Sequence, residues 1–124
     1  MYSHRHISFR RKLGNLDKKV FHTFIARIDK VKIQDNGIKA IMLRKVRCNG
    51  KKKASHVWLR IGESFSYLNL VEGTYIRFKS RIYMYSKNSQ YNNTGRVVNY
   101  GLRNPIHMEV LSEDEYMRII NRTK

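Results

Sequence analysis

Basic and aromatic side chains alternate along residues 74–85, where the chain reads TYIRFKSRIYMY. In a β-strand, side chains two residues apart share a face, so one face of this segment would carry mostly cations and tyrosine rings. Proteins hold single-stranded nucleic acid with such groups, because rings stack on bases and cations contact phosphates. The alternative is a solvated face on which tyrosine rings cover arginine stems. The candidate binding residues on this face are Arg77, Lys79, Arg81, Tyr83 and Tyr85.

The single tryptophan of the chain, Trp58, lies in a second alternating segment, residues 55–61. If the apolar Val57 and Leu59 face the core, Trp58 faces outward beside Arg60. An exposed indole next to a guanidinium favours base stacking and cation–π contact. The alternative is that this large ring closes one end of a barrel, and the sequence leaves both readings open.

Six cations occur within ten residues, at the end of a predicted strand and in the turn that follows: Arg44, Lys45, Arg47, Lys51, Lys52 and Lys53. This density favours phosphate contacts over a generic solvated hairpin, because clustered cations are the electrostatic footprint of nucleic-acid binding. Residues 10–12 extend the argument to the N-terminus, although such an arm can also be disordered. Tyr91, in the polar loop 86–96, is a weaker candidate for a residue that closes over the ligand.

Catalytic chemistry finds little support in the residues. Acidic side chains are few and scattered, and no pair has a spacing that indicates general acid–base work. Cys48 has basic neighbours that could lower its thiol pKa, but no histidine lies near it in sequence to act as a base. His4 and His6 could bind a metal, yet they belong to the N-terminal tail. We therefore expect no enzymatic activity, no cofactor and no metal site.

The composition indicates a folded domain with a polyanionic partner. The chain has 124 residues, 26 Lys and Arg against 9 Asp and Glu, and a net charge of +17. Its hydrophobic content of 41% is enough for a core, so it is not a disordered basic tail. Residues 1–62 hold seventeen of the basic and three of the acidic residues, a net +14, whereas residues 112–124 are neutral. Nucleic acid is the first expectation for the partner, and an anionic membrane surface is a poor one.

The single cysteine and the short apolar runs exclude further classes of protein. One cysteine excludes an internal disulfide framework and a thiolate-rich zinc site, which fits a reducing, cytoplasmic setting. The longest uninterrupted apolar run is about four residues, far short of the roughly 20 that a transmembrane helix needs. We expect no membrane association.

Periodicity predicts a mostly-β chain. The first strand changes phase near Asp29 and Lys30, which predicts a β-bulge. Hairpin turns are predicted at residues 35–37 and 49–50, and a capping box at residues 112–115 begins a helix. Residues 97–104 stay ambiguous because Gly101 interrupts them. The predicted strands are 20–33, 38–48, 55–61, 74–85 and 106–110, with a short helix within 65–70 and a C-terminal helix after residue 112.

This order of elements is that of the OB-fold, a five-stranded Greek-key barrel with a short helix between strands 3 and 4. In that fold the second and third strands and nearby loops bind oligonucleotides. We expect a basic N-terminal arm over residues 1–19 that can be flexible, the barrel over 20–111, and a C-terminal helix over 112–124 packed on the barrel.

The block HVWLRIGESFSYLNLVEGTYIRFKSRIYMY, followed by NYGLRNPIHMEVL, carries a family resemblance. It resembles small OB-fold, single-strand-binding-like proteins encoded by phages and mobile elements of low-GC bacteria, over roughly residues 20–111. The resemblance implies DNA rather than RNA as the ligand, and the cytoplasm of a bacterial host as the setting. The chain differs from housekeeping single-strand-binding proteins because its last residues are not acidic.

The leading functional hypothesis is a protein that binds single-stranded nucleic acid, DNA favoured over RNA, with low sequence specificity in phage or mobile-element DNA metabolism. A second hypothesis is an interaction protein that docks on a host protein or nucleoprotein complex and inhibits or redirects it, because OB-folds host many functions. A third is binding of RNA or the ribosome. The sequence leaves the oligomeric state open.

Overall fold

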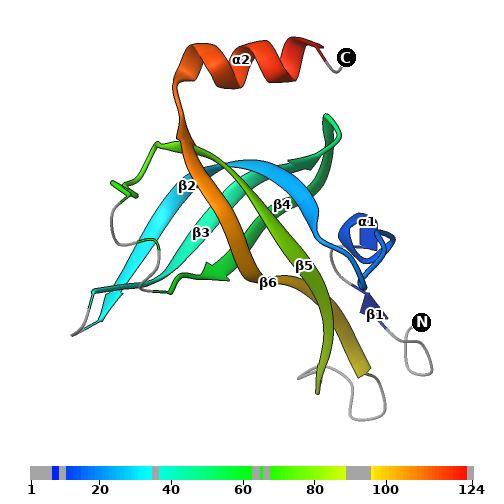
Figure 1. The fold of residues 1–124 in the computed structure, drawn as a ribbon. Helices are drawn as coiled ribbons and strands as arrows, with labels where there is room; N and C mark the ends of the chain where they lie inside the picture. Colours follow the sequence, from blue (N-terminus) through cyan, green and yellow to red (C-terminus); the bar gives the residue numbers. More distant parts are fainter. Residues whose placement is uncertain are drawn as a thin grey trace.

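The computed structural model describes residues 7–8, 11–34, 37–62, 65, 68–88 and 96–122. Strands dominate these residues, with two short helices (Figure 1). In chain order the elements are β1 (Ile7–Ser8), α1 (Arg11–Gly14), β2 (His22–Gln34), β3 (Gly37–Cys48), β4 (Lys51–Arg60), β5 (Tyr75–Asn88), β6 (Arg96–Leu111) and α2 (Glu113–Arg122).

One curved sheet contains all the strands, in the order β1-β6-β5-β2-β3-β4. The long strands β2 to β6 pair antiparallel, and the two-residue β1 pairs parallel with β6. Strands β4 and β6 are not hydrogen-bonded neighbours, yet the curvature of the sheet brings them close together (Figure 1). The predicted mostly-β class with five main strands is confirmed, as an open sheet that curls around a single large core.

Strand β2 pairs with β5 over residues 22–27 and with β3 over residues 25–34, and a bulge changes the phase of its side chains along the way. Phe24, Ala26 and Ile28 are fully buried, and Phe24 packs its ring 5.8 Å from that of Phe78 on β5. The pairing with β3 then skips a residue at Asp29, which confirms the predicted bulge. Beyond the bulge, the charged Lys30 lies on the outer face and is exposed, whereas Ile28 before the bulge is buried.

Strands β3 and β4 form a hairpin through the predicted turn at residues 49–50. Asn49 and Gly50 both have positive φ, 54° and 77°, as the type I′ turn of a two-residue hairpin loop requires. Ile41 and Leu43 of β3 are fully buried, so the odd-numbered residues of this part of the strand face the core. The other predicted turn, at residues 35–37, falls mostly outside the described residues, although Gln34 and Gly37 pair across it.

The predicted helix within residues 65–70 is not seen in the part of this segment that the structure describes. The Leu68 backbone N–H donates to the Phe65 carbonyl at 3.0 Å, and that of Leu70 donates to the Leu68 carbonyl at 3.1 Å. These bonds span three and two residues rather than the four of an α-helix. Phe65 and Leu70 are both buried in the core, so this segment is held by the packing of these two side chains and not by a regular helix.

The last strand is longer than predicted. Strand β6 runs from residue 96 to 111, through Gly101 and Pro105, and not only over 106–110. It passes the proline because the pairing with β5 skips residues on both sides of Ile106, next to Asn104 and His107, whose φ angles are 56° and 52°. Proline is tolerated at such bulges because no ladder hydrogen bond is needed there.

Part of the expected N-terminal arm packs on the sheet. Leu13 of α1 is fully buried and belongs to the main core. A Cβ at Gly14 would overlap the ring of Tyr100 on β6, so only glycine at this position lets α1 approach β6 so closely. Lys18 secures this contact, since its Nζ donates to the Gly14 carbonyl at 2.7 Å and lies 5.1 Å from the Tyr100 ring centre.

The C-terminal helix α2 begins at the predicted capping box. The Glu115 backbone N–H donates to Ser112 Oγ, and the Ser112 N–H donates to Glu115 Oε1, both at 3.1 Å. Tyr116 is buried and stacks on Tyr75 of β5 with ring centres 3.9 Å apart. With Ile25 and Leu111 these rings form a second, smaller apolar cluster on the outer side of the sheet.

Candidate nucleic-acid interface

Trp58 points away from the core. Its neighbours in β4, Val57 and Leu59, are 1% and 0% exposed, whereas the Trp58 side chain is 45% exposed. The alternation follows the two-residue period of a strand whose one face packs on the core. The reading in which the indole closes the end of a barrel is therefore excluded, and the ring is accessible to a ligand.

Strand register places cations on both sides of this ring. Trp58 pairs with Met42 of β3, and Met42 pairs with Lys30 of β2. Directly opposed side chains lie about 5 Å apart, so this row crosses the outer side of three strands, although Met42 itself is only 8% exposed. The neighbouring rows, again in register, are Arg27, Arg44 and His56 on one side, and Lys32, Ala40 and Arg60 on the other. We call these nine residues the Trp58 face.

One acidic side chain lies among these cations. Asp29, the bulge residue of β2, pairs with Arg44, whose Nε lies 2.9 Å from Asp29 Oδ2. Arg44 is thereby oriented and partly neutralised, although its side chain stays 51% exposed. Lys30, Lys32 and Arg60 are exposed and make no ion pair with any carboxylate that the structure describes. The face is strongly positive around a single aromatic ring.

The cations of the β3–β4 hairpin have different roles. Arg47 is half-buried and braces the turn, since its Nη1 donates to the Gly50 carbonyl at 3.3 Å. Lys45, in a left-handed conformation with φ of 53°, and Lys51 and Lys52 are exposed. Lys53 is half-buried toward α1. The predicted cluster is thus divided between a structural arginine and lysines that face different directions.

The basic side chains of β5 are mostly engaged by the protein itself. Arg77 forms an ion pair with Glu109 on β6, and its Nε donates to the same carboxylate at 2.5 Å. Arg81 donates through Nη2 to the Lys19 carbonyl at 3.1 Å and lies over the Phe21 ring. These contacts join β5 to β6 and to the chain before β2. Of Arg77, Lys79 and Arg81, Lys79 is the most exposed.

Tyr83 and Tyr85 are half-exposed and stack on each other, with ring centres 5.4 Å apart. The Arg103 guanidinium lies over the Tyr83 ring at 5.6 Å. Tyr83 also packs over its cross-strand partner Gly101, where a Cβ would lie 2.7 Å from the ring. The Tyr83 ring is therefore already in contact with Tyr85, Arg103 and Gly101. The remaining candidate, Tyr91, lies outside the described residues.

Sequence reasoning missed Lys30, Lys32 and Met42 as members of the Trp58 face. The signal was present, because the bulge predicted near Asp29 moves Lys30 and Lys32 to the outer side of β2. What no local pattern contained was the pairing that aligns them with Trp58. Arg103 was missed because it contacts Tyr83 only across the β5–β6 pair.

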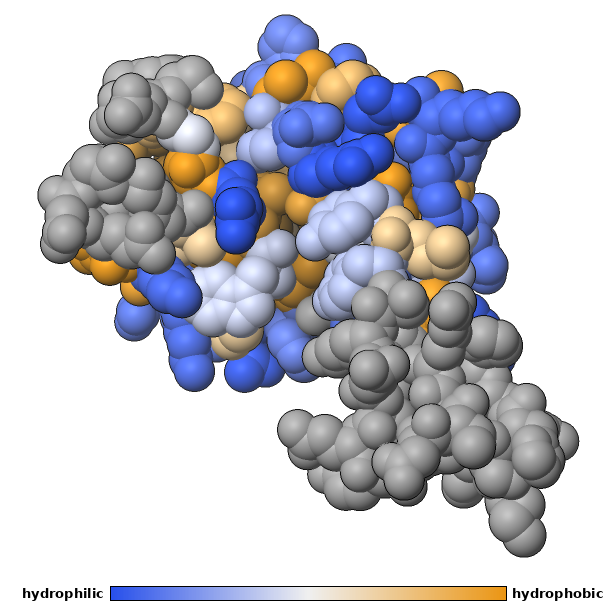
Figure 2. All heavy atoms as spheres, turned by 90° about the horizontal axis from the view of Figure 1, so that it is seen from below, coloured by the Kyte–Doolittle hydropathy of each residue, from blue (hydrophilic) through white to orange (hydrophobic). Residues whose placement is uncertain are grey.

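Exposed apolar side chains are otherwise scattered. Figure 2 shows one face, from below, on which hydrophobic residues are visible between hydrophilic ones. Single exposed apolar residues are normal on protein surfaces, and Trp58 differs from them because the rows beside its own carry Arg44 and Arg60. Among the residues whose exposure the structure describes, the large apolar side chains exposed by 40% or more are Val20, Phe21, Ile33, Trp58, Val71, Met84, Val110 and Met117.

The titratable groups offer no nucleophile or metal centre in the described part of the chain. Burial raises the pKa of the Cys48 thiol. Nearby Lys53 lowers this pKa, as basic neighbours were expected to do, but by less than burial raises it. Among the described residues, no three His, Cys, Asp or Glu side chains gather as metal ligands would. None of the described helices is long and apolar enough to cross a bilayer.

Comparison with known proteins adds no family to these observations: no protein-family model matches the chain, and no curated protein does either.

Proposed function

We propose that this protein binds single-stranded nucleic acid, DNA in preference to RNA, with little sequence preference and without enzymatic activity. One observation carries the proposal: a solvent-exposed Trp58 on the edge strand of a three-strand outer face, with cations in the neighbouring rows on either side of its row. The sequence resemblance described above supports DNA as the ligand and phage or mobile-element DNA metabolism in a bacterial cytoplasm as the setting.

The proposal includes a finer fold, the OB-type Greek-key barrel. The pairing order β6-β5-β2-β3-β4, with β4 brought near β6, supports it. If the barrel strands are counted from β2, the second and third strands are β3 and β4. These are the strands whose outer surface binds oligonucleotides in OB-folds, and they carry Met42 and Trp58.

The chemistry of the Trp58 face suits a single strand. An unpaired base can lay its flat face on the indole, which contributes about 1–3 kcal/mol per stacked base in such proteins. The flanking cations Lys30, Lys32 and Arg60 would contact the phosphates on either side of that base. In a duplex the faces of the bases are covered by stacking, so a duplex could contact the cations of the Trp58 face but could not stack a base on the indole. None of these contacts depends on base identity.

Fluorescence titration tests the proposal directly, because Trp58 is the only tryptophan. Saturable quenching by an oligo-dT strand is expected, with weaker binding both of the matching duplex and of the RNA strand of the same sequence. Equal or tighter binding of the duplex would refute the single-strand proposal. Binding without any change in Trp58 emission would place the ligand elsewhere.

Salt dependence tests the charges of the face. Each phosphate contact to a single strand contributes about −0.7 to the slope of log affinity against log salt. The variant K32Q/R60Q should therefore flatten the slope by about 1.4. The matched control is R118Q/R122Q, which removes the same charge from exposed positions on α2. An equal change in both variants would mean that only net charge matters.

A further inference from the structure

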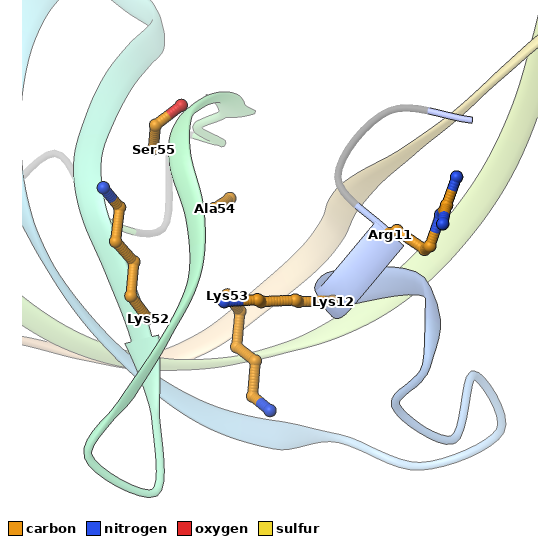
Figure 3. A pocket seen from close by; sticks show the side chains of 6 residues that line it. All are labelled: Arg11, Lys12, Lys52, Lys53, Ala54 and Ser55. Atoms are coloured by element: carbon orange, nitrogen blue, oxygen red, sulfur yellow. The ribbon is translucent and has the colours of Figure 1, made fainter. Parts of the chain in front are cut away.

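A second basic site lies away from the Trp58 face, in a cleft between α1 and β4. The cleft has a volume of about 340 Å³ and is lined by Arg11, Lys12, Lys52, Lys53, Ala54 and Ser55. Figure 3 shows Lys12 reaching from α1 across to β4, next to Lys53. At roughly 30 Å³ per water molecule in the liquid, the cleft has room for a phosphate group and its hydration.

The charges in this cleft are uncompensated. No acidic side chain lines it, and none of its four cations forms an ion pair with a carboxylate in the described ranges. Lys12 and Lys53 lie next to each other where α1 faces β4 (Figure 3), and like charges this close destabilise a fold unless something offsets them. A bound anion would remove that cost, whereas solvent only screens it.

The packing of α1 on the sheet holds the two sides of the cleft, α1 and β4, close together. Residues 11–12 and 52–53 are 41 positions apart in the chain. Helix α1, which carries residues 11 and 12, is anchored in the core by the fully buried Leu13. Gly14 packs under Tyr100, and Lys18 locks that contact with a 2.7 Å hydrogen bond. The cations of α1 are therefore placed by core packing and not by a mobile tail.

The arginines near α2 provide an instructive contrast. Arg77 pairs with Glu109, and the smaller cleft that Arg77 shares with Arg118 and Arg122 also contains Glu115. There each concentration of positive charge has a carboxylate beside it. The α1–β4 cleft is different because Arg and Lys side chains line it without a carboxylate, and guanidinium and ammonium groups both bind phosphate.

We propose that the α1–β4 cleft binds a phosphate group, independently of base stacking on Trp58. Two sources have this chemistry: a phosphate of a nucleic-acid strand and a free polyphosphate. The site would give the protein a second, base-independent contact with its ligand.

The test uses inorganic pyrophosphate as the probe and the full chain as the protein. Titration by NMR should give saturable shifts of the amides of residues 11–14 and 52–55, with the Trp58 indole signal unchanged. The variant K12Q/K53Q should weaken pyrophosphate binding about ten-fold or more, because one lost charge-assisted hydrogen bond already has that effect. The control R118Q/R122Q carries the same charge change and should bind like the wild type.

Thermal unfolding gives a second readout. Pyrophosphate should raise the Tm of the wild type and of R118Q/R122Q, but not that of K12Q/K53Q. Without ligand, K12Q/K53Q should be at least as stable as the wild type, since it removes like-charge repulsion. Shifts spread over all basic residues without saturation, or equal losses in the two double variants, would overturn the proposal.

Competition identifies the source of the phosphate. If a 5′-phosphorylated oligo-dT displaces pyrophosphate and the 5′-hydroxyl strand does not, the site takes a terminal phosphate. Equal displacement by both indicates backbone phosphates, and displacement by neither indicates a free polyphosphate. W58A separates this site from the proposed function: it should lose strand binding on the Trp58 face and keep pyrophosphate binding.

Discussion

Asp29 and Arg44 face each other across β2 and β3, with Oδ2 and Nε 2.9 Å apart. The contact exists because the β-bulge turns Asp29 to the outer side of the sheet, where β3 presents Arg44. The pair orients one guanidinium of the Trp58 face and lowers the charge of that face. Both side chains are partly solvent-exposed, so the pair contributes little to stability.

Replacing this acid should strengthen nucleic-acid binding. In D29N the face loses its negative charge and Arg44 becomes available to a phosphate, so oligo-dT affinity at low salt should rise about two-fold or more. The free energy of unfolding should fall by less than about 1 kcal/mol. Fluorescence titration and urea unfolding measure the two effects. E113Q on α2, with the same charge change, is the control, and weaker binding by D29N would contradict the charge argument.

Removing the indole should impair binding far more than folding. W58A should lose about 1–3 kcal/mol of binding free energy, which is roughly 5- to 150-fold in affinity, while W58F should keep part of it. Stability should fall by only about 1 kcal/mol, because nearly half of the side chain is already in solvent. Anisotropy with a labelled strand replaces Trp fluorescence here. Unchanged affinity in W58A would remove the centre of the proposed interface.

The capping box should make α2 sensitive to acid. The Ser112 backbone N–H donates to Glu115 and lowers the pKa of that carboxyl below its usual 4.5. A group whose pKa is lower in the folded state stabilises the fold above its unfolded pKa, and this contribution disappears as the pH falls through the folded value. E115Q should therefore be less stable than the wild type near pH 7, and the difference should shrink below about pH 4.5. Urea unfolding across this range measures it, and a pH-independent difference would contradict the assignment.

The Tyr83–Gly101 contact should show strong coupling in a double-mutant cycle. G101A places a methyl group 2.7 Å from the Tyr83 ring and should destabilise the protein by about 1–3 kcal/mol, as overpacking does. In the Y83A background the same change should be neutral or stabilising, because alanine is better than glycine within a strand once the ring is gone. Denaturant unfolding of the four proteins gives the coupling energy. Additive effects would show that the ring does not require glycine there.

Local patterns predicted much of the fold. The change of phase at Asp29, the Asn49–Gly50 turn and the Ser112 capping box each depend on a few neighbouring residues, and each was confirmed. Where the prediction was wrong, distant residues decided. The segment over residues 65–70 is held by burial in a core that other strands build, and β6 continues past Pro105 because β5 accommodates its bulges.

The candidate site divides in the same way. Alternation in β4 predicted an outward Trp58 if Val57 and Leu59 face the core, and they do. The side chains of β5 also alternated as expected, yet Arg77 and Arg81 are taken up by contacts to β6 and to the chain before β2. A strand pattern states which way a side chain points, and it does not state what meets it there.

The sequence alone determined the charge, the strand periods, the turns and the cap, because each is a property of single residues or of near neighbours. Only the tertiary structure decided that Lys30, Met42 and Trp58 share one row, and that α1 brings Lys12 to Lys53. Those placements depend on register between strands and on the burial of Leu13 in a shared core. Both are set by packing between segments tens of residues apart, which no local pattern records.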